Sequence, residues 1–122
     1  MVYKGTLIRV IDNSGGQFAQ CLKILRKSIK SRGRLGDKLT VVIKKALPGK
    51  KVHSHEIHKA IIVRDPNSMR RADGSYLKFI NPGIIILKKD GTPLAKRILG
   101  PVAKELRNKG HLKIISISSI AI

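Results

Sequence analysis

A run of histidines is the part of the chain whose residue types come closest to metal chemistry. The run His53-Ser54-His55-Glu56-Ile57-His58 places three imidazoles and one carboxylate within six residues, and both groups are ligands that zinc accepts. A hydrolytic site of this kind also needs ligands from distant segments, and only His111 remains elsewhere as a further histidine. We therefore expect neither a metal nor a cofactor, and we interpret the run as a polar loop that leads into a strand.

No other group of side chains matches a catalytic motif. The sequence has no glycine-rich phosphate loop and no serine nucleophile motif. Cys21 is the single cysteine and lies in an apolar run, so an intramolecular disulfide is impossible and a reducing compartment fits. The order Asp12-Asn13-Ser14 is typical of a carboxylate that caps a turn. We therefore predict that the protein is not an enzyme.

The basic residues are the strongest functional signal. The 122 residues include 26 lysines and arginines but only 7 aspartates and glutamates, which gives a formal net charge of +19 at pH 7. Such a surface repels itself unless polyanions screen it, and cations that neutralise phosphates release counterions and so drive binding. Nucleic acid is the expected partner. A membrane is not, because the basic residues are spread along the chain and no amphipathic helix carries them.

Most of these basic residues fall where loops are expected, and loops are where a small β-domain presents contacts to a ligand. The candidate nucleic-acid-binding residues are Arg26, Lys27, Lys30, Arg32, Arg34, Lys44, Lys45, Lys50, Lys51, Lys59, Arg64, Arg70, Arg71 and Lys78. A second group near the C-terminus comprises Lys96, Arg97, Lys104, Arg107 and Lys113. Aromatic residues make up only 3% of the sequence, so we expect binding through phosphate and shape and not through base stacking.

The hydrophobic pattern predicts one small, mainly β domain over residues 1–122, with an aliphatic core. The predicted strands are Thr6 to Ile11, Phe18 to Leu25, Leu39 to Ile43, Ile57 to Val63, Tyr76 to Phe79 and Gly83 to Leu87. Between them, Asp73-Gly74 and Asp90-Gly91 indicate hairpins. Closely spaced short strands favour a barrel, because closure removes exposed edges. Helix is expected only from Pro101 to about Asn108, and Leu112 to Ile117 is expected to pack back as an extended segment.

Four parts of the sequence match one known family in residue type and spacing. They are Val10-Ile11-Asp12-Asn13-Ser14-Gly15; Gly36-Asp37 with Lys44-Lys45-Ala46-Leu47-Pro48; Lys59-Ala60-Ile61-Ile62-Val63-Arg64 with Arg70-Arg71-Ala72-Asp73-Gly74-Ser75 and Phe79; and Gly91-Thr92-Pro93-Leu94, Arg97-Ile98-Leu99-Gly100-Pro101-Val102, Glu105-Leu106-Arg107 and Lys113-Ile114-Ile115-Ser116. With these segments the chain resembles, end to end, the universal large-subunit ribosomal protein L-fourteen family.

The resemblance implies a five-stranded β-barrel with hairpin extensions, a short C-terminal helical region and no catalytic activity. It also implies a structural role in the large ribosomal subunit during translation, bound to large-subunit rRNA near the subunit interface. The neighbours would be proteins of the L-three and L-nineteen types, with an intersubunit bridge to small-subunit rRNA and a docking site for a ribosome-silencing factor. In this interpretation the first basic group binds rRNA, and the second lies at the subunit interface or a protein-docking surface.

The chain departs from the usual bacterial pattern of this family in three places. His55-Glu56 stands where bacterial members carry a Gly-Asp turn, and Ile80-Asn81-Pro82-Gly83 replaces an acidic, Asn-containing turn. Ala95-Lys96 replaces Gly-Thr in the region that members use for silencing-factor docking. The first departure and the Ile/Lys-rich composition resemble mitochondrial members. We therefore predict the mitochondrial matrix, in the mitochondrial large ribosomal subunit, with a bacterial cytoplasm or a plastid ribosome as the alternative; Met1 to Gly5 shows no secretory signal.

Two other classes of function make different demands on the molecule. A free RNA-binding barrel would show a platform of aromatic side chains on adjacent strands. A small metal-dependent enzyme would hold stoichiometric zinc through His53, His55 and His58. The ribosomal interpretation is favoured over both.

Overall fold

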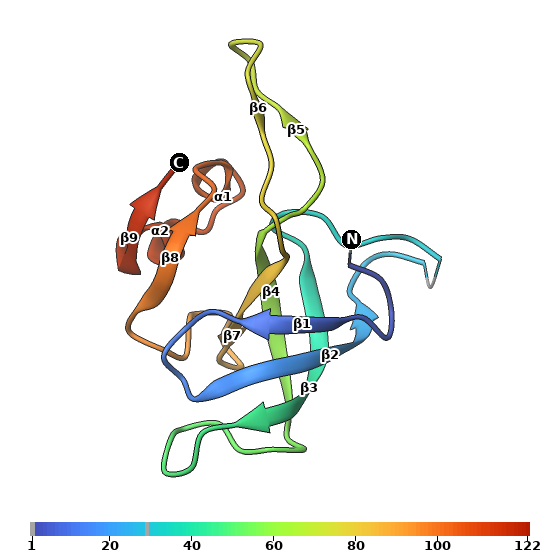
Figure 1. Ribbon diagram of the computed structural model, residues 1–122, viewed down its shortest axis with the longest axis vertical. Helices are drawn as coiled ribbons and strands as arrows, with labels where there is room; N and C mark the ends of the chain where they lie inside the picture. Colours follow the sequence, from blue (N-terminus) through green and yellow to red (C-terminus); the bar gives the residue numbers. More distant parts are fainter. Residues whose placement is uncertain (1, 29) are drawn as a thin grey trace.

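The computed structural model describes residues 2–28 and 30–122, and most of its regular structure is β-strand (Figure 1). Met1 of the N-terminal segment and position 29 of the predicted basic loop lie outside the described residues. In chain order the elements are β1 (Leu7–Val10), β2 (Gly16–Ile24), β3 (Lys38–Ala46), β4 (Ile57–Arg64), β5 (Met69–Arg70), β6 (Tyr76–Leu77), β7 (Gly83–Leu87), β8 (Ile98–Val102), α1 (Glu105–Asn108), α2 (Leu112–Ile117) and β9 (Ser118–Ala121).

Five of these strands close into a barrel in the order β1-β2-β3-β4-β7. Neighbouring strands are antiparallel, except that β1 and β7 run parallel. The predicted mainly β fold with a five-stranded barrel is therefore confirmed. None of the helices within the described ranges is long and apolar enough to cross a membrane.

Strand β7 and residues 60–63 of β4 are apolar on both faces because they separate two cores. Successive side chains of a strand point to opposite faces, and every residue of β7 is buried. Ile84 and Ile86 belong to the cluster inside the barrel. Ile85 and Leu87 belong to a second cluster on the outside of the barrel. The uninterrupted aliphatic run of β7 is therefore what burial on both faces requires.

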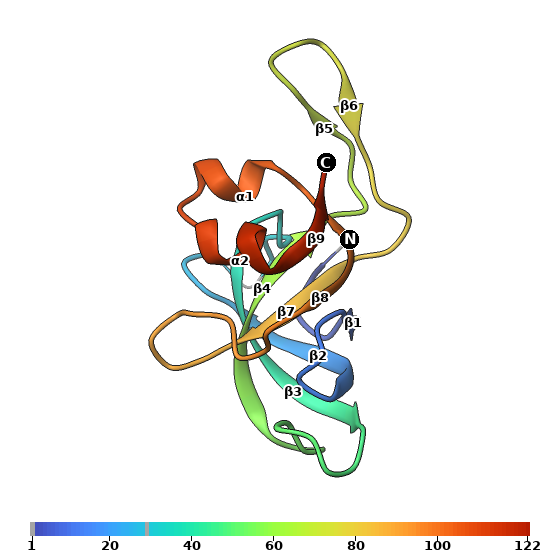
Figure 2. The ribbon, with the colours of Figure 1, turned by 90° about the vertical axis from the view of Figure 1, so that its left-hand side faces the viewer.

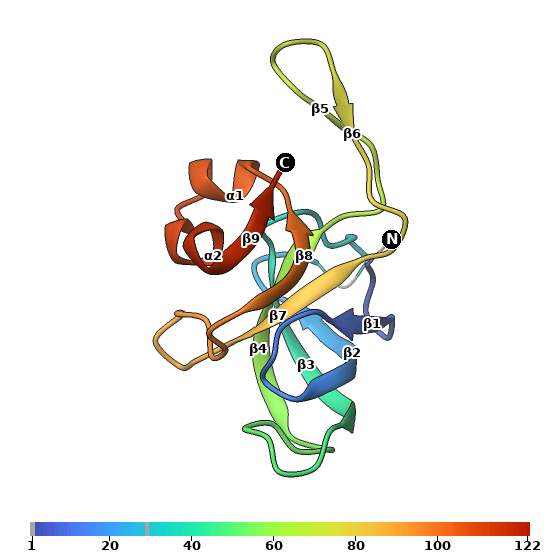
Figure 3. The ribbon, with the colours of Figure 1, turned by 60° about the vertical axis from the view of Figure 1, so that its left-hand side comes forward.

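The second core is closed by a C-terminal unit made of β8, α1, α2 and β9. Figures 2 and 3 show these elements grouped on one side of the barrel. Strands β8 and β9 pair in parallel, and the helices contribute Leu106 and Ile114 to the outer cluster. The unit thus covers the apolar outer face of β4 and β7.

The hairpin formed by β5 and β6 projects beyond the barrel (Figure 1), and its Met69 and Leu77 pack against the outer cluster. Its turn is closed by the Arg71 N–H, which donates to the Ser75 oxygen at 2.9 Å. The hairpin predicted at Asp73-Gly74 is confirmed. At Asp90-Gly91 the chain also reverses, with the Lys88 N–H donating to the Thr92 oxygen at 2.7 Å.

Three local predictions were wrong. Residues Leu112–Ile117 form a helix and not an extended segment, because parallel strands such as β8 and β9 require a crossover connection. The helix predicted from Pro101 begins only at Glu105. Pro101 instead pairs with Ile120 in the two-stranded sheet, where a missing N–H is tolerated. The strand predicted from Tyr76 to Phe79 ends at Leu77 and lies in the hairpin, outside the barrel.

Candidate nucleic-acid interface

A β-bulge turns two of the predicted lysines toward solvent at the end of β3. Ala19 of β2 pairs with Ile43, but Phe18 pairs with Lys45, so Lys44 is an extra residue in β3. A bulge bends the strand and redirects side chains. The alternation of buried and exposed residues along β3 breaks at this point, and both Lys44 and Lys45 are exposed.

The loop between β3 and β4 is fixed against the turn between β1 and β2. The Leu47 N–H donates to the Gly15 oxygen at 2.8 Å, and the Val52 N–H donates to the Ser14 oxygen at 3.2 Å. Gly15 has a φ of +107°, and a Cβ there would lie 2.2 Å from the Cβ of Lys50. Only glycine fits both constraints, and its use allows Lys50 to sit directly against the turn.

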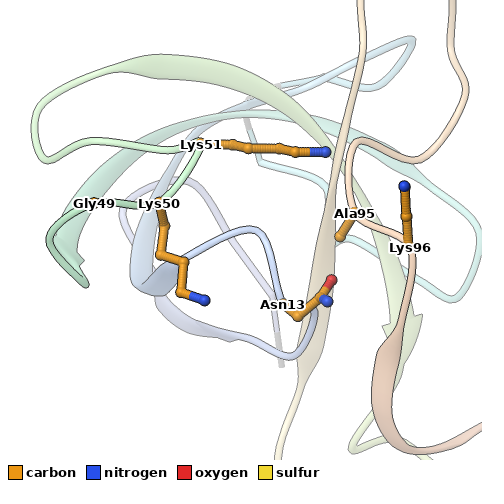
Figure 4. A pocket seen from close by; sticks show the side chains of 6 residues that line it. All are labelled: Asn13, Gly49, Lys50, Lys51, Ala95 and Lys96. Carbon is orange, nitrogen blue, oxygen red and sulfur yellow. The ribbon is translucent and has the colours of Figure 1, made fainter.

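One hollow brings together residues from the two predicted basic groups. It is lined by Lys50 and Lys51 from the β3–β4 loop and by Lys96 from the β7–β8 connection, with Asn13 between them (Figure 4). Asn13 joins these parts, because its Oδ1 accepts from the Arg97 N–H at 3.3 Å and its own N–H donates to the Arg97 oxygen at 3.3 Å. The three ammonium groups make this hollow strongly cationic.

The described part of the basic loop before β3 is held by Asp37. The carboxylate Oδ2 of Asp37 pairs with Lys27 Nζ at 2.7 Å and accepts from the Arg34 N–H at 2.7 Å. In the same loop, the Gly33 N–H donates to the Val2 oxygen at 2.5 Å. The loop lines an open hollow with Arg26, Lys27, Ser28, Ser31, Arg32 and Arg34. Asp37 therefore shapes a surface that is otherwise lined by cations and hydroxyl groups.

Adjacent arginines in the hairpin have different surroundings. Arg70 is exposed. Arg71 donates through Nε to Glu105 Oε1 at 2.7 Å and through Nη2 to the backbone oxygen of Ile122. Arg71 thus ties the turn end of the hairpin to the C-terminal unit, while Arg70 points to solvent.

Arg64, at the end of β4, holds β8 against the barrel. Its Nε donates to the Pro101 oxygen at 2.8 Å, and its Nη2 donates to the Leu99 oxygen. Between these residues, Gly100 has a φ of +82°, and a Cβ there would lie 2.3 Å from Nη2. Burial, and secondarily the charge of Arg9, lowers the pKa of Arg64. The guanidinium of Arg64 therefore stabilises the fold by holding β8 against the barrel.

The remaining predicted basic residues lie on the surface. Lys30, Lys59 and Lys78 are exposed, and so is the whole C-terminal group of Lys96, Arg97, Lys104, Arg107 and Lys113. Lys109, a neighbour of that group in sequence, is also exposed, but its Nζ donates to the Leu35 oxygen at 2.7 Å.

The histidine run does not assemble as a metal cage in the described part of the chain. His58 Nε2 lies 2.6 Å from Glu56 Oε2, whereas His53 and His55 are exposed. Among the described residues, no three or more histidine, cysteine, aspartate or glutamate side chains are grouped to hold a metal. Cys21 is buried, and burial raises the pKa of its thiol.

Asp12 is a turn cap, as predicted, and also an anchor between distant strands. Its Oδ1 accepts from the Ser14 N–H at 3.1 Å and from the Ser14 hydroxyl at 2.5 Å. Its Oδ2 accepts from the Ile86 N–H at 3.0 Å. The side chain is buried, so this carboxylate fixes the turn that carries Asn13 and Gly15 to the barrel.

Arg9 is a surface cation that the sequence clusters did not include. It is exposed on β1, directly opposite Phe18 of β2. A lone arginine among aliphatic residues does not stand out as a cluster. The alternation in Leu7-Ile8-Arg9-Val10 was the available signal, because it places Arg9 on the outer face of the strand.

The whole chain matches one family model. The model described as ribosomal protein L14p/L23e matches residues 1–122. The match therefore includes the barrel, the hairpin, the C-terminal unit and all the basic surfaces described above.

Proposed function

Because the chain belongs to the ribosomal protein L14p/L23e family, and is therefore a structural protein of the large ribosomal subunit, we propose that its exposed lysines and arginines bind large-subunit rRNA. The family also implies association with other ribosomal proteins and a role in translation. The proposal concerns which surfaces make these contacts.

The observation that carries the proposal is how the chain uses its few carboxylates. Asp12, Asp65, Asp73 and Asp90 accept hydrogen bonds within their own turns. Within residues 2–28 and 30–122, the ion pairs between a carboxylate and a lysine or arginine are Lys27 with Asp37 and Arg71 with Glu105. The acidic residues therefore stabilise the fold and leave most of the cations for an external polyanion, which rRNA supplies.

The predicted rRNA-binding residues then divide by role. The exposed members make the phosphate contacts: Arg26, Lys30, Arg34, Lys44, Lys45, Lys50, Lys51, Lys59, Arg70 and Lys78. Lys27, Arg64 and Arg71 position the surfaces through their intramolecular bonds. Arg32, half-buried beside Asn67, belongs to the hollow of the basic loop.

The exposed C-terminal basic group forms the second proposed surface. Lys96, Arg97, Lys104, Arg107 and Lys113 face the subunit interface, where they contribute to a bridge with small-subunit rRNA. Proteins of the L-three and L-nineteen types are the proposed neighbours, and a ribosome-silencing factor is the proposed transient partner at Ala95-Lys96-Arg97. Support comes from the exposure of all five cations. The mitochondrial large ribosomal subunit is the proposed location, on the sequence grounds given above.

Sedimentation of a tagged chain in sucrose gradients of mitochondrial ribosomes tests the rRNA surface. We expect the unchanged chain in the large-subunit peak and less of the variant in which Lys44, Lys45, Lys50 and Lys51 are all changed to Gln. The matched control changes Lys4, Lys23, Lys88 and Lys89, which are also exposed but lie outside the proposed surface, to Gln. In binding to purified rRNA, the slope of log K against log salt should fall by about three for the first variant, at about 0.7 to 0.9 per lost phosphate contact.

Two results would contradict the proposal. If the unchanged chain stays out of the large-subunit peak, the ribosomal location is wrong. If the two quadruple variants lose incorporation and salt slope equally, net charge and not the β3–β4 surface is what matters.

A further inference from the structure

Three side chains form a row across neighbouring strands on the outside of the barrel. Arg9 of β1 pairs with Phe18 of β2, and Phe18 pairs in turn with Lys45 of β3. Side chains at directly paired positions share a face of the sheet, with Cβ atoms about 5 Å apart. All three are exposed, and 39% of the surface of Phe18 is accessible. An aromatic side chain is therefore flanked on both sides by a cation.

The row lines a groove that runs between the barrel and β8. Lys50 and Leu99 also line it, and Asp12 lies in its floor. The Asp12 carboxylate is buried and its oxygens already accept three hydrogen bonds, and the cations that line the groove outnumber this one carboxylate. Among the described residues, no carboxylate forms an ion pair with Arg9, Lys45 or Lys50.

We propose that this groove binds an unpaired RNA nucleotide, with the base stacked on the ring of Phe18 and the adjoining phosphates against Arg9 and Lys45. Aromatic side chains stack bases of every type, and cations beside them neutralise the backbone. A base within a duplex already stacks on its neighbours, so the site selects a looped-out or single-stranded nucleotide. The inference rests on the proposed rRNA binding and adds a base contact to the phosphate contacts.

The surroundings of the row favour RNA over a peptide. A peptide commonly binds by adding a strand to an open sheet edge. Strands β1, β2 and β3 each have a partner on both sides in the closed barrel. The free edge of β8 is already in use, because the Leu99 N–H donates to the Ile11 oxygen and Arg64 donates to the Leu99 and Pro101 oxygens. The described part of this groove therefore offers a peptide no open strand edge. The two flanking cations without an acidic partner instead match the charge of a phosphate backbone.

Tryptophan fluorescence provides a direct test, because the chain contains no tryptophan. In the full-length Phe18→Trp variant, a short oligoadenylate RNA should quench the emission as it binds. An abasic sugar-phosphate strand of the same length should bind without quenching. The control is Ile57→Trp, at a position on β4 that is 65% exposed and outside the groove; its emission should remain unchanged with both strands.

Affinity measurements separate stacking from charge. Phe18→Leu should weaken oligoadenylate binding about tenfold without changing the salt slope, and Phe18→Tyr should retain the affinity. Arg9→Gln and Lys45→Gln should each lower the slope by about 0.7. The quenching experiment does not depend on the folding of Phe18→Leu.

The outcomes distinguish this inference from the proposed function. Equal quenching of the Phe18→Trp and Ile57→Trp variants, or equal affinity of the unchanged chain and Phe18→Leu, would overturn the stacking site, even if the tagged chain still enters the large subunit. If RNA does not quench Phe18→Trp, but the assembled subunit shields it from a soluble quencher, a protein segment occupies the groove and the inference is wrong. Failure of the tagged chain to enter the subunit would instead remove the proposed function.

Discussion

At the scale of single residues, four aspartates perform the same local task in different surroundings. Asp12, Asp65, Asp73 and Asp90 each accept a hydrogen bond through Oδ1 from the N–H two residues later. The exposed carboxylates of Asp73 and Asp90 have a lowered pKa, chiefly through the hydroxyl groups of Ser75 and Thr92. Only Asp12 is buried, and burial raises its pKa despite its hydrogen bonds.

Because Oδ2 of Asp12 accepts from the Ile86 N–H, the change of Asp to Asn should cost more stability at position 12 than at position 90. In Asp12→Asn, the side-chain NH2 would replace either the oxygen facing Ser14 or the one facing the Ile86 N–H, so one buried donor loses its acceptor. We expect a loss of about 1 to 3 kcal/mol in the free energy of unfolding, measured by urea denaturation. Asp90→Asn is the control, because Asp90 has the same turn bonds in an exposed position and should cost little.

The raised pKa of Asp12 makes the stability difference between the unchanged chain and Asp12→Asn depend on pH. Between the ordinary value of 3.8 and the raised pKa, the folded protein binds a proton that the unfolded chain has released. Stability from this group is therefore full below the ordinary value and decreases as pH rises through the raised pKa. The stability difference between the unchanged chain and Asp12→Asn should shrink over that interval. A difference that grows with pH would show that the hydrogen bonds outweigh burial.

The sequence predicts local bonds of single residues better than distant ones. Asp12-Asn13-Ser14 was enough to predict a turn cap, because the cap lies within three consecutive residues. The bond to Ile86 joins positions 74 residues apart, and no local pattern indicates it. Arg64 and Arg71 were assigned to rRNA on charge alone. Their partners, Leu99 and Glu105, lie 35 and 34 residues away, and folding is needed to reveal them.

At the scale of elements, local sequence predicts the strands of the barrel better than it predicts the C-terminal unit. The aliphatic runs of β4 and β7 predict strands directly, because Val and Ile favour the pleated sheet. The isoleucines of Leu112–Ile117 suggest the same state, but the parallel pairing of β8 and β9 makes this segment part of a crossover. A long-range pairing that the local pattern does not contain therefore decides the conformation.

The two arginines of the hairpin give a prediction at this scale. Arg71→Gln removes the donors to Glu105 and to the Ile122 oxygen, which also accepts from the Lys104 N–H. We expect faster amide hydrogen exchange at Lys104 and Ile122, because their hydrogen bonds open more often. Arg70→Gln should leave exchange unchanged and lower the salt slope of rRNA binding by about 0.7 to 0.9. Identical exchange in both variants would contradict the anchoring role of Arg71.

At the scale of the whole molecule, the fold presents many positive surface charges that repel one another. The net charge of +19 is distributed over a barrel whose two cores are aliphatic. The carboxylates mostly cap turns, so they contribute to the fold more than to the neutralisation of the surface. Net charge was predictable from composition alone. The use of the acidic residues was not, because it depends on which hydrogen-bond donors surround each one.

This imbalance predicts that salt stabilises the RNA-free protein. At about 10 mM ionic strength the screening length is about 30 Å, so like charges across the molecule repel, whereas at about 150 mM it is about 8 Å. We therefore expect Tm to rise with NaCl over this range, followed by circular dichroism. Weakening of the surface ion pairs opposes the rise, but each is worth at most about 1 kcal/mol. The variant with Gln at positions 44, 45, 50 and 51 should show a smaller rise, because four positive charges are gone. A Tm that stays constant or falls with salt would contradict the prediction that repulsion among the positive surface charges destabilises the RNA-free protein.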